Sequence, residues 1–104
     1  DVYKRQSLDS SYLKFLQHIV KRCEQADTTL SYCGEDAGRP IEALCLAAIG
    51  INTLSMRPAS IGPVKHLLLR TDLTSLKTVI DQACSKGGTA VRDQVNEFFL
   101  QQPR

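Results

Sequence analysis

Residues 32–40, Tyr-Cys-Gly-Glu-Asp-Ala-Gly-Arg-Pro, decide the fold because they join a strand to a helix within a few positions. The run at 28–33 is rich in Thr and Tyr, too short for a helix and closed by Gly34, so it predicts a buried strand. Gly34 to Gly38 are expected to form a loop. Arg39-Pro40 then opens a helix, because proline is pre-organised for the first helical turn.

Outward from this stretch, the pattern is helical on both sides. Upstream, apolar residues recur about every 3.6 positions, which predicts a helix from Ser10, capped by Asp9 or Ser10, to near Asp27. Downstream, a helix is expected to end at Gly50, and residues 53–56 predict a second short strand. Three more helices are expected. The first is capped by Ser60 and has Pro63 in its first turn, with Val64, Leu67 and Leu68 facing inward. The second covers 72–86, and the third is capped by Thr89.

Strands that alternate with helices favour parallel strands joined by right-handed crossovers. Two strands cannot form a parallel sheet with neighbours on both sides, so the elements indicate part of something larger. A (β/α)8 TIM barrel needs about 250 residues. The expected fold class is therefore α/β: a fragment of such a barrel, its last strands and helices, with a helix-rich C-terminus.

The composition excludes several functions. The chain has 104 residues, 42% hydrophobic, with 13 basic and 11 acidic side chains and a net charge of +2, which suits one modest domain. Its mixed charges do not form the basic surface that nucleic acid requires. No apolar run reaches the roughly 18 residues of a membrane span, and no signal peptide pattern is present. We expect a soluble, cytoplasmic protein with no nucleic acid partner and no membrane insertion.

The four cysteines contain no C-x-x-C pair, which argues against a zinc knuckle or a thioredoxin-like motif. Three of them, Cys23, Cys45 and Cys84, lie on predicted apolar helix faces, where a thiol packs as a small hydrophobe. Cys33 instead ends a strand, where parallel α/β proteins place their active sites. Thiols have an ordinary pKa of about 8.5, so Cys33 is a candidate proton donor. The alternative, a buried filler, stays open at this point.

Other candidate residues have simpler interpretations. Gly34 and Gly38 permit close approach of the backbone to a ligand. Glu35 and Asp36 can favour the positive end of the following helix. His18 and His66 have no second ligand at helical spacing, so no metal site is predicted in this chain.

Several motifs then carry a resemblance. Cys33-Gly34-Glu35, Ala37-Gly38 and Arg39-Pro40, followed by Leu54-Ser55-Met56, Pro58-Ala59-Ser60 and Ile61-x-Pro63-Val64-Lys65, resemble the C-terminal end of the phosphoenolpyruvate-utilising barrel domain. The similarity is greatest to enzyme I of the bacterial phosphotransferase system, the phosphoenolpyruvate-protein phosphotransferases, in particular the nitrogen-related branch. On this basis, 1–6 is an unstructured lead or cloning remnant, 7–73 the last quarter of the barrel, and 74–104 C-terminal helices.

The resemblance implies a transferase, a kinase acting on phosphoenolpyruvate. With Mg²⁺, such enzymes move the phosphoryl group to a histidine of a separate domain and on to a histidine phosphocarrier protein, in sugar transport or nitrogen regulation. The family's cysteine, here Cys33, supplies a proton to enolpyruvate. Gly34, Glu35 and Gly38 match the motif and are expected to shape the substrate loop. The metal-binding carboxylates, the phosphate-binding arginines and the phosphorylated histidine would precede Ser7, so the fragment alone is expected to be inactive. The parent enzyme is expected to be a homodimer.

Two residues depart from the family pattern. Asp36 stands where relatives have an apolar or small residue, and Arg57 stands where Ser is common. Arg57 would add a cation if it faced the barrel mouth, but we expect a solvated charge that points outward. The alternatives are a fragment of a pyruvate phosphate dikinase or phosphoenolpyruvate synthase, or a stand-alone helical interaction module.

Overall fold

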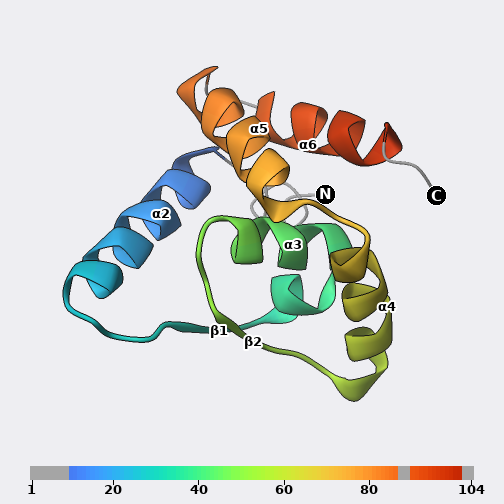
Figure 1. The fold of residues 1–104 in the computed structure, drawn as a ribbon, viewed down its shortest axis with the longest axis horizontal. Helices are drawn as coiled ribbons and strands as arrows, with labels where there is room; N and C mark the ends of the chain where they lie inside the picture. The colour runs from blue at the N-terminus through green and yellow to red at the C-terminus, as the bar shows by residue number, and fades with distance from the viewer. Residues whose placement is uncertain (1–9, 87–89, 102–104) are drawn as a thin grey trace.

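The computed structural model describes residues 10–86 and 90–101, apart from the side chains of Glu35, Asp36 and Ala90. The elements follow the order α2 (Ser10–Gln25), β1 (Ser31–Cys33), η1 (Glu35–Gly38), α3 (Pro40–Ala48), β2 (Thr53–Ser55), α4 (Pro58–Leu69), α5 (Leu73–Lys86) and α6 (Ala90–Leu100). In Figure 1, α3 lies in the middle, between the two strands and the pair formed by α5 and α6. The predicted order of helices and strands is confirmed, and the α/β class with it.

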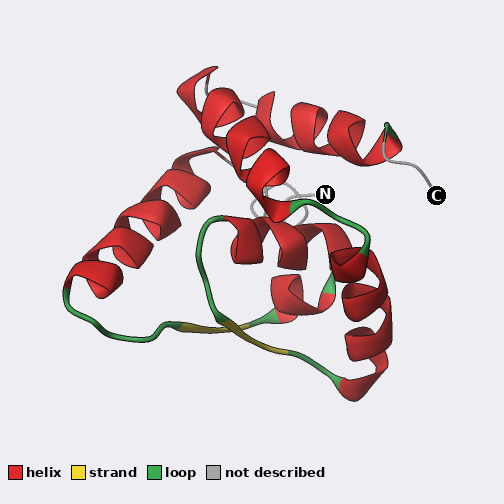
Figure 2. Cartoon of the chain, viewed as in Figure 1, coloured by secondary structure: helices red, strands yellow, loops and turns green. Residues whose placement is uncertain are grey.

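The sheet contains two parallel strands within the described residues, and helices dominate the rest (Figure 2). In the register, Tyr32 is opposite Leu54 and Cys33 is opposite Ser55. Side chains alternate between the two faces of a strand, and only the middle residue of each strand is half-buried. The prediction of a buried strand at 28–33 is therefore wrong, because the helices cover one face of the pair and no third strand flanks it in the described chain.

Helix α3 forms the centre of the core. Pro40 occupies its first turn after the extended Arg39, as predicted, and five of its nine residues are buried. Beyond its C-terminus, Gly50 has a φ of +112°, which a residue with a Cβ rarely adopts. A Cβ at Gly50 would lie 2.7 Å from Val20 Cγ1, so the missing side chain also lets α2 approach this turn.

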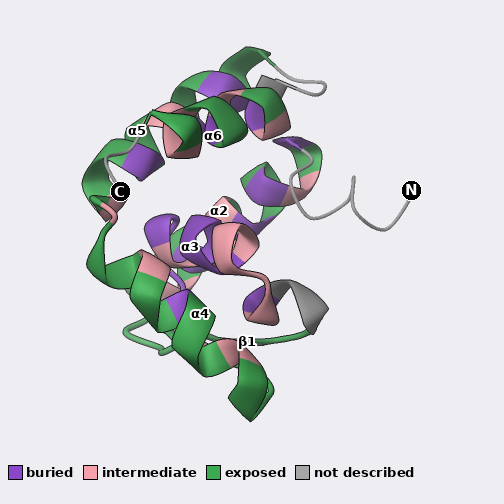
Figure 3. Cartoon of the chain, turned by 90° about the vertical axis from the view of Figure 1, so that its right-hand side faces the viewer, coloured by how far each residue is buried: buried purple, intermediate pink, exposed green. Residues whose placement is uncertain are grey.

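The buried side chains come mainly from the inward faces of α2, α3, α5 and α6, whereas most of α4 is exposed (Figure 3). The largest side chains that are almost completely buried are those of Leu13, Leu44, Cys45, Leu76, Ile80, Val91 and Val95. Each fully buried aliphatic side chain contributes about 1.5–3 kcal/mol relative to an exposed one. The second half of the chain therefore shares one core with the strand and helix unit.

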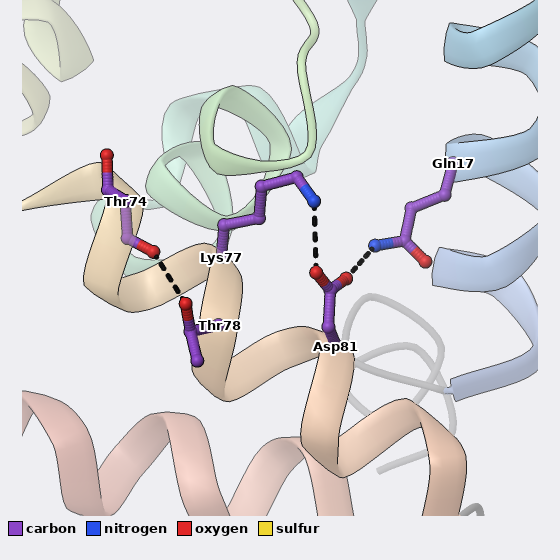
Figure 4. Close-up of polar contacts among 5 residues, drawn as sticks. All are labelled: Gln17, Thr74, Lys77, Thr78 and Asp81. Carbon is purple, nitrogen blue, oxygen red and sulfur yellow. Dashed lines mark hydrogen bonds and ion pairs between the residues drawn. The ribbon is translucent and has the colours of Figure 1, made fainter.

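A polar bridge ties α2 to α5 at the edge of this core (Figure 4). Gln17 Nε2 donates to Asp81 Oδ1 at 2.8 Å, and Lys77 Nζ lies 2.9 Å from Asp81 Oδ2. Figure 4 also shows Thr78, whose Oγ1 donates to the Thr74 carbonyl at 3.1 Å within α5. Asp81 thus receives hydrogen bonds from two helices.

Three local predictions are wrong. Residues 35–38 form a 3-10 helix instead of a loop. Helix α4 begins at Pro58 and not after Ser60, because Arg57 is extended and proline suits the first turn; Pro63 consequently lies inside the helix. Leu68, expected to face inward, is exposed, whereas Val64 is buried. The expected caps Asp9 and Thr89 lie outside the described residues.

Candidate functional site

An open pocket of about 630 Å³ lies where both strands end. Its lining is drawn from the ends of β1 and β2, from the turn before α3, and from the start of α4: Cys33, Gly34, Gly38, Arg39, Ser55, Met56, Arg57 and Ser60. In a parallel pair, the carboxyl ends of both strands meet at one edge, and the next helix starts there. The topology therefore gathers these residues from two separate segments of the chain.

Cys33 contributes a thiol to the lining of this pocket. It is the last residue of β1, it pairs with Ser55, and it is the exposed cysteine of the four. Cys45 and Cys84 are buried and Cys23 is half-buried, which confirms the distinction between Cys33 and the three packing cysteines. The interpretation of Cys33 as a buried filler is wrong for this structure.

The neighbouring residue holds the end of β1 in place. Tyr32 points to the opposite face of the strand from Cys33, and its hydroxyl lies 2.7 Å from the hydroxyl of Tyr12 on α2. Either hydroxyl can donate. This contact joins β1 to α2, so the strand that positions the Cys33 thiol is held in place through its opposite face.

Two glycines, Gly34 and Gly38, belong to the pocket wall. A Cβ at Gly38 would lie 2.9 Å from Ser60 Oγ, so the absent side chain lets η1 pack against the first turn of α4. A Cβ at Gly34 would lie 3.4 Å from Tyr32 Cε1. The structure thus brings Gly34 and Gly38 beside Cys33. The backbone of Glu35 lies in η1, whereas the side chains of Glu35 and Asp36 are outside the part of the chain that the structure describes.

Arginines stand at both helix starts that border the pocket. Arg39 precedes α3 and Arg57 precedes α4, each with an extended backbone and no side-chain cap on the helix. Helix N-termini carry a partial positive charge, and the described lining contains no carboxylate. The pocket is therefore suited to an anion. Arg57 is exposed, as expected for a solvated charge, and it is also one of the residues that line the pocket.

Sequence reasoning did not place Arg39, Ser55, Met56 and Ser60 beside Cys33. The signal that could have done so is the parallel register, which puts the end of the second strand next to the end of the first. In contrast, neither histidine lines the pocket. His18 is exposed on α2, and Nε2 of His66, on α4, lies 3.2 Å from Nη1 of Arg70, the residue after that helix.

Neither a metal site nor a membrane span is found in the described ranges. Across residues 10–86 and 90–101, no three His, Cys, Asp or Glu side chains are grouped to hold a metal ion. Within the same ranges, no helix is both long enough and apolar enough to cross a bilayer. The described lining of the pocket contains no carboxylate that could bind Mg²⁺.

Comparison with known proteins identifies what the chain is similar to. Residues 2–73 match the family described as PEP-utilising enzyme, PEP-binding domain. A Phosphoenolpyruvate-dependent phosphotransferase system protein of Salmonella typhimurium strain LT2 is 33% identical over 94 residues, covering 89% of this chain and 13% of that protein. Its Escherichia coli K12 counterpart is 32% identical over the same shares.

A Phosphoenolpyruvate-protein phosphotransferase of Haemophilus influenzae strain Rd is 28% identical over 90 residues, covering 86% of this chain and 16% of that protein. The chain thus spans only 13% of the length of the first two curated relatives. No solved structure matches the chain.

Proposed function

The chain belongs to the PEP-binding domain family of PEP-utilising enzymes, and from that premise we propose that it is the C-terminal part of a phosphoenolpyruvate-protein phosphotransferase. Phosphotransferase names among its relatives favour this enzyme over a dikinase or phosphoenolpyruvate synthase. The observation that carries the proposal is the exposed thiol of Cys33 in an anion-suited pocket at the ends of two parallel strands.

The chain would form the last quarter of a (β/α)8 barrel. Two observations support this. Within the described residues, β1 and β2 pair only with each other, so their outer edges are open to further strands. An apolar hollow of about 560 Å³ runs along β2 and α4, where Ile61 and Leu68 are exposed. The earlier barrel strands and helices would cover both features.

The proposed chemistry has two stages. Phosphoryl transfer from phosphoenolpyruvate to a histidine of a separate domain breaks the bond between phosphorus and the enol oxygen. This leaves the enolate of pyruvate, and the phosphoryl group passes on to a histidine phosphocarrier protein. The Sγ–H of Cys33 then gives its proton to carbon 3, a C–H bond forms, and the C2 oxygen becomes the ketone of pyruvate. The thiolate regains a proton from solvent. General acid catalysis contributes about 10²–10⁴-fold.

Several properties belong to the parent enzyme. When bound, Mg²⁺ neutralises charge on the transferred phosphoryl group. Its ligands would come from residues outside the described part of this chain, and this chain alone would be inactive. The parent would be a cytoplasmic homodimer that serves sugar transport or nitrogen regulation. Glu35 would help to shape the substrate loop with Gly34 and Gly38.

The test uses the complete enzyme with Cys33→Ala and Cys33→Ser. Both variants should still form the phosphohistidine from phosphoenolpyruvate, because the thiol takes no part in that stage. Pyruvate formation should slow by roughly 10²-fold or more, since enolpyruvate must then be protonated by solvent. Cys23→Ala, a half-buried thiol on α2, is the matched control and should retain both rates. Undiminished pyruvate formation in both Cys33 variants would remove Cys33 from the mechanism.

A further inference from the structure

Arg57 lies close to the proposed proton donor although it belongs to a different segment. Cys33 ends β1 opposite Ser55, and Arg57 is two residues further along the chain, which corresponds to about 7 Å of extended backbone. Both residues line the same pocket. The exposed guanidinium of Arg57 makes no hydrogen bond or ion pair with any described side chain. Its charge is therefore available to a bound molecule.

The surroundings of Arg57 reinforce a preference for negative charge. Helix α4 starts directly after it and has no acidic residue in its first turn, so the partial positive charge of the helix adds to that of the guanidinium. Arg39, which precedes the start of α3, also lines the pocket. A guanidinium presents paired N–H donors that match a carboxylate or phosphate group.

We infer that Arg57 binds an anionic oxygen of phosphoenolpyruvate, on its carboxylate or phosphate group, and holds the substrate with carbon 3 near Cys33. The inference rests on the proposed function and adds to it a substrate-binding residue within this chain. A cation there acts on the bound substrate as a whole, so its loss should raise KM for phosphoenolpyruvate more than it lowers kcat.

The experiment measures KM and kcat for phosphoenolpyruvate in the complete enzyme. Arg57→Gln removes the charge and keeps a polar side chain of similar reach, and it should raise KM about tenfold, the lower end of the range for hydrogen bonds to charged groups. Arg57→Lys keeps the charge without the paired donors and should recover part of that loss. The rise of KM with added salt should be shallower in Arg57→Gln. Arg22→Gln, an exposed arginine on α2 outside this pocket, is the matched control and should leave KM unchanged.

Each other outcome has a defined meaning. If Arg57→Gln keeps the wild-type KM for phosphoenolpyruvate while Cys33→Ala still slows pyruvate formation, the inference is wrong and the proposed function stands. If Arg57→Gln raises only the KM for the phosphoryl acceptor, Arg57 faces the acceptor, and the inference is again wrong. If the complete enzyme does not convert phosphoenolpyruvate, the proposed function itself fails. A circular dichroism spectrum that matches wild type shows that any change in KM is not a folding defect.

Discussion

The four cysteines of this chain should differ in reactivity by orders of magnitude, and the structure fixes the order. Cys33 is exposed and should be alkylated first by iodoacetamide at about pH 8. Cys45 is 1% exposed, and burial, followed by the charge of Glu42 and the neighbouring Cys84, raises its pKa to about 12. Because the thiolate is the nucleophile, Cys45 should be the most protected of the four.

The magnitude for Cys45 can be worked from its pKa. At about pH 8, an ordinary thiol with a pKa of about 8.5 is roughly one quarter thiolate, whereas a thiol with a pKa of about 12 is ionised in roughly one molecule in 10⁴. A more basic thiolate is a better nucleophile, and over the pKa difference between about 8.5 and about 12 the rate constant of the thiolate itself rises about 40-fold, which offsets part of the loss. Cys45 should therefore react about 60-fold more slowly than free cysteine from protonation alone, and burial should slow it further.

Mass spectrometry of tryptic peptides after timed alkylation measures each site separately. Cys33→Ser should remove the fastest site and leave the other rates unchanged, whereas Cys23→Ala should leave the fastest site in place. The reasoning is refuted if Cys45 is alkylated as fast as free cysteine, or if Cys33 is protected in the folded chain. Either result would place the thiols in surroundings different from those described here.

Two further predictions concern backbone and charge. Gly50→Ala should destabilise the fold by about 2–5 kcal/mol, because it forces a positive φ on alanine and places a Cβ 2.7 Å from Val20 Cγ1. The control is Gly62→Ala, in open space on α4, which should stabilise the fold by about 0.5–1 kcal/mol. Equal urea midpoints for the two variants would contradict this account. Hydrogen bonds from the side chain and backbone of Ser75 lower the pKa of Asp72 at the start of α5. The ionised Asp72 carboxylate therefore stabilises the folded state fully above an ordinary carboxyl pKa of about 4, and this stabilisation is lost as the pH falls through the lowered pKa of Asp72. Asp72→Asn keeps the cap and should flatten this part of the acid unfolding curve, and a curve of unchanged slope would contradict the assignment.

Much of the fold follows from local signals in the sequence. Pro40 and Gly50 mark the two ends of α3 because one residue fixes φ and the other permits a positive value. Apolar residues about 3.6 positions apart predict α2 and α5, because at that spacing they lie on one side of a helix, and this is the side that is buried in each. Cys33 could be singled out because it alone among the cysteines ends a predicted strand, whereas the other three lie on the apolar faces of predicted helices.

The remainder depends on contacts that no local pattern contains. The exposure of β1 depends on how many strands flank it, and the strand sequence does not record that number. Leu68 fits the helical stripe of α4, yet it is exposed because nothing in the described chain packs against that side of the helix. Arg57 and Ser60 reach the pocket only through the pairing of β2 with β1, so their relation to Cys33 emerges from the register.

The most direct test of the central claim, that Cys33 protonates enolpyruvate, is the stereochemistry of that proton transfer. The complete enzyme would be run in D₂O with (Z)-3-fluorophosphoenolpyruvate, and the fluoropyruvate trapped at once by reduction so that the configuration at carbon 3 can be measured. Wild type should give one configuration, because the proton comes from a fixed donor on one face. Cys33→Ala should give an equal mixture, because released enol is protonated by solvent on either face. A single configuration formed by Cys33→Ala at the wild-type rate would contradict the claim.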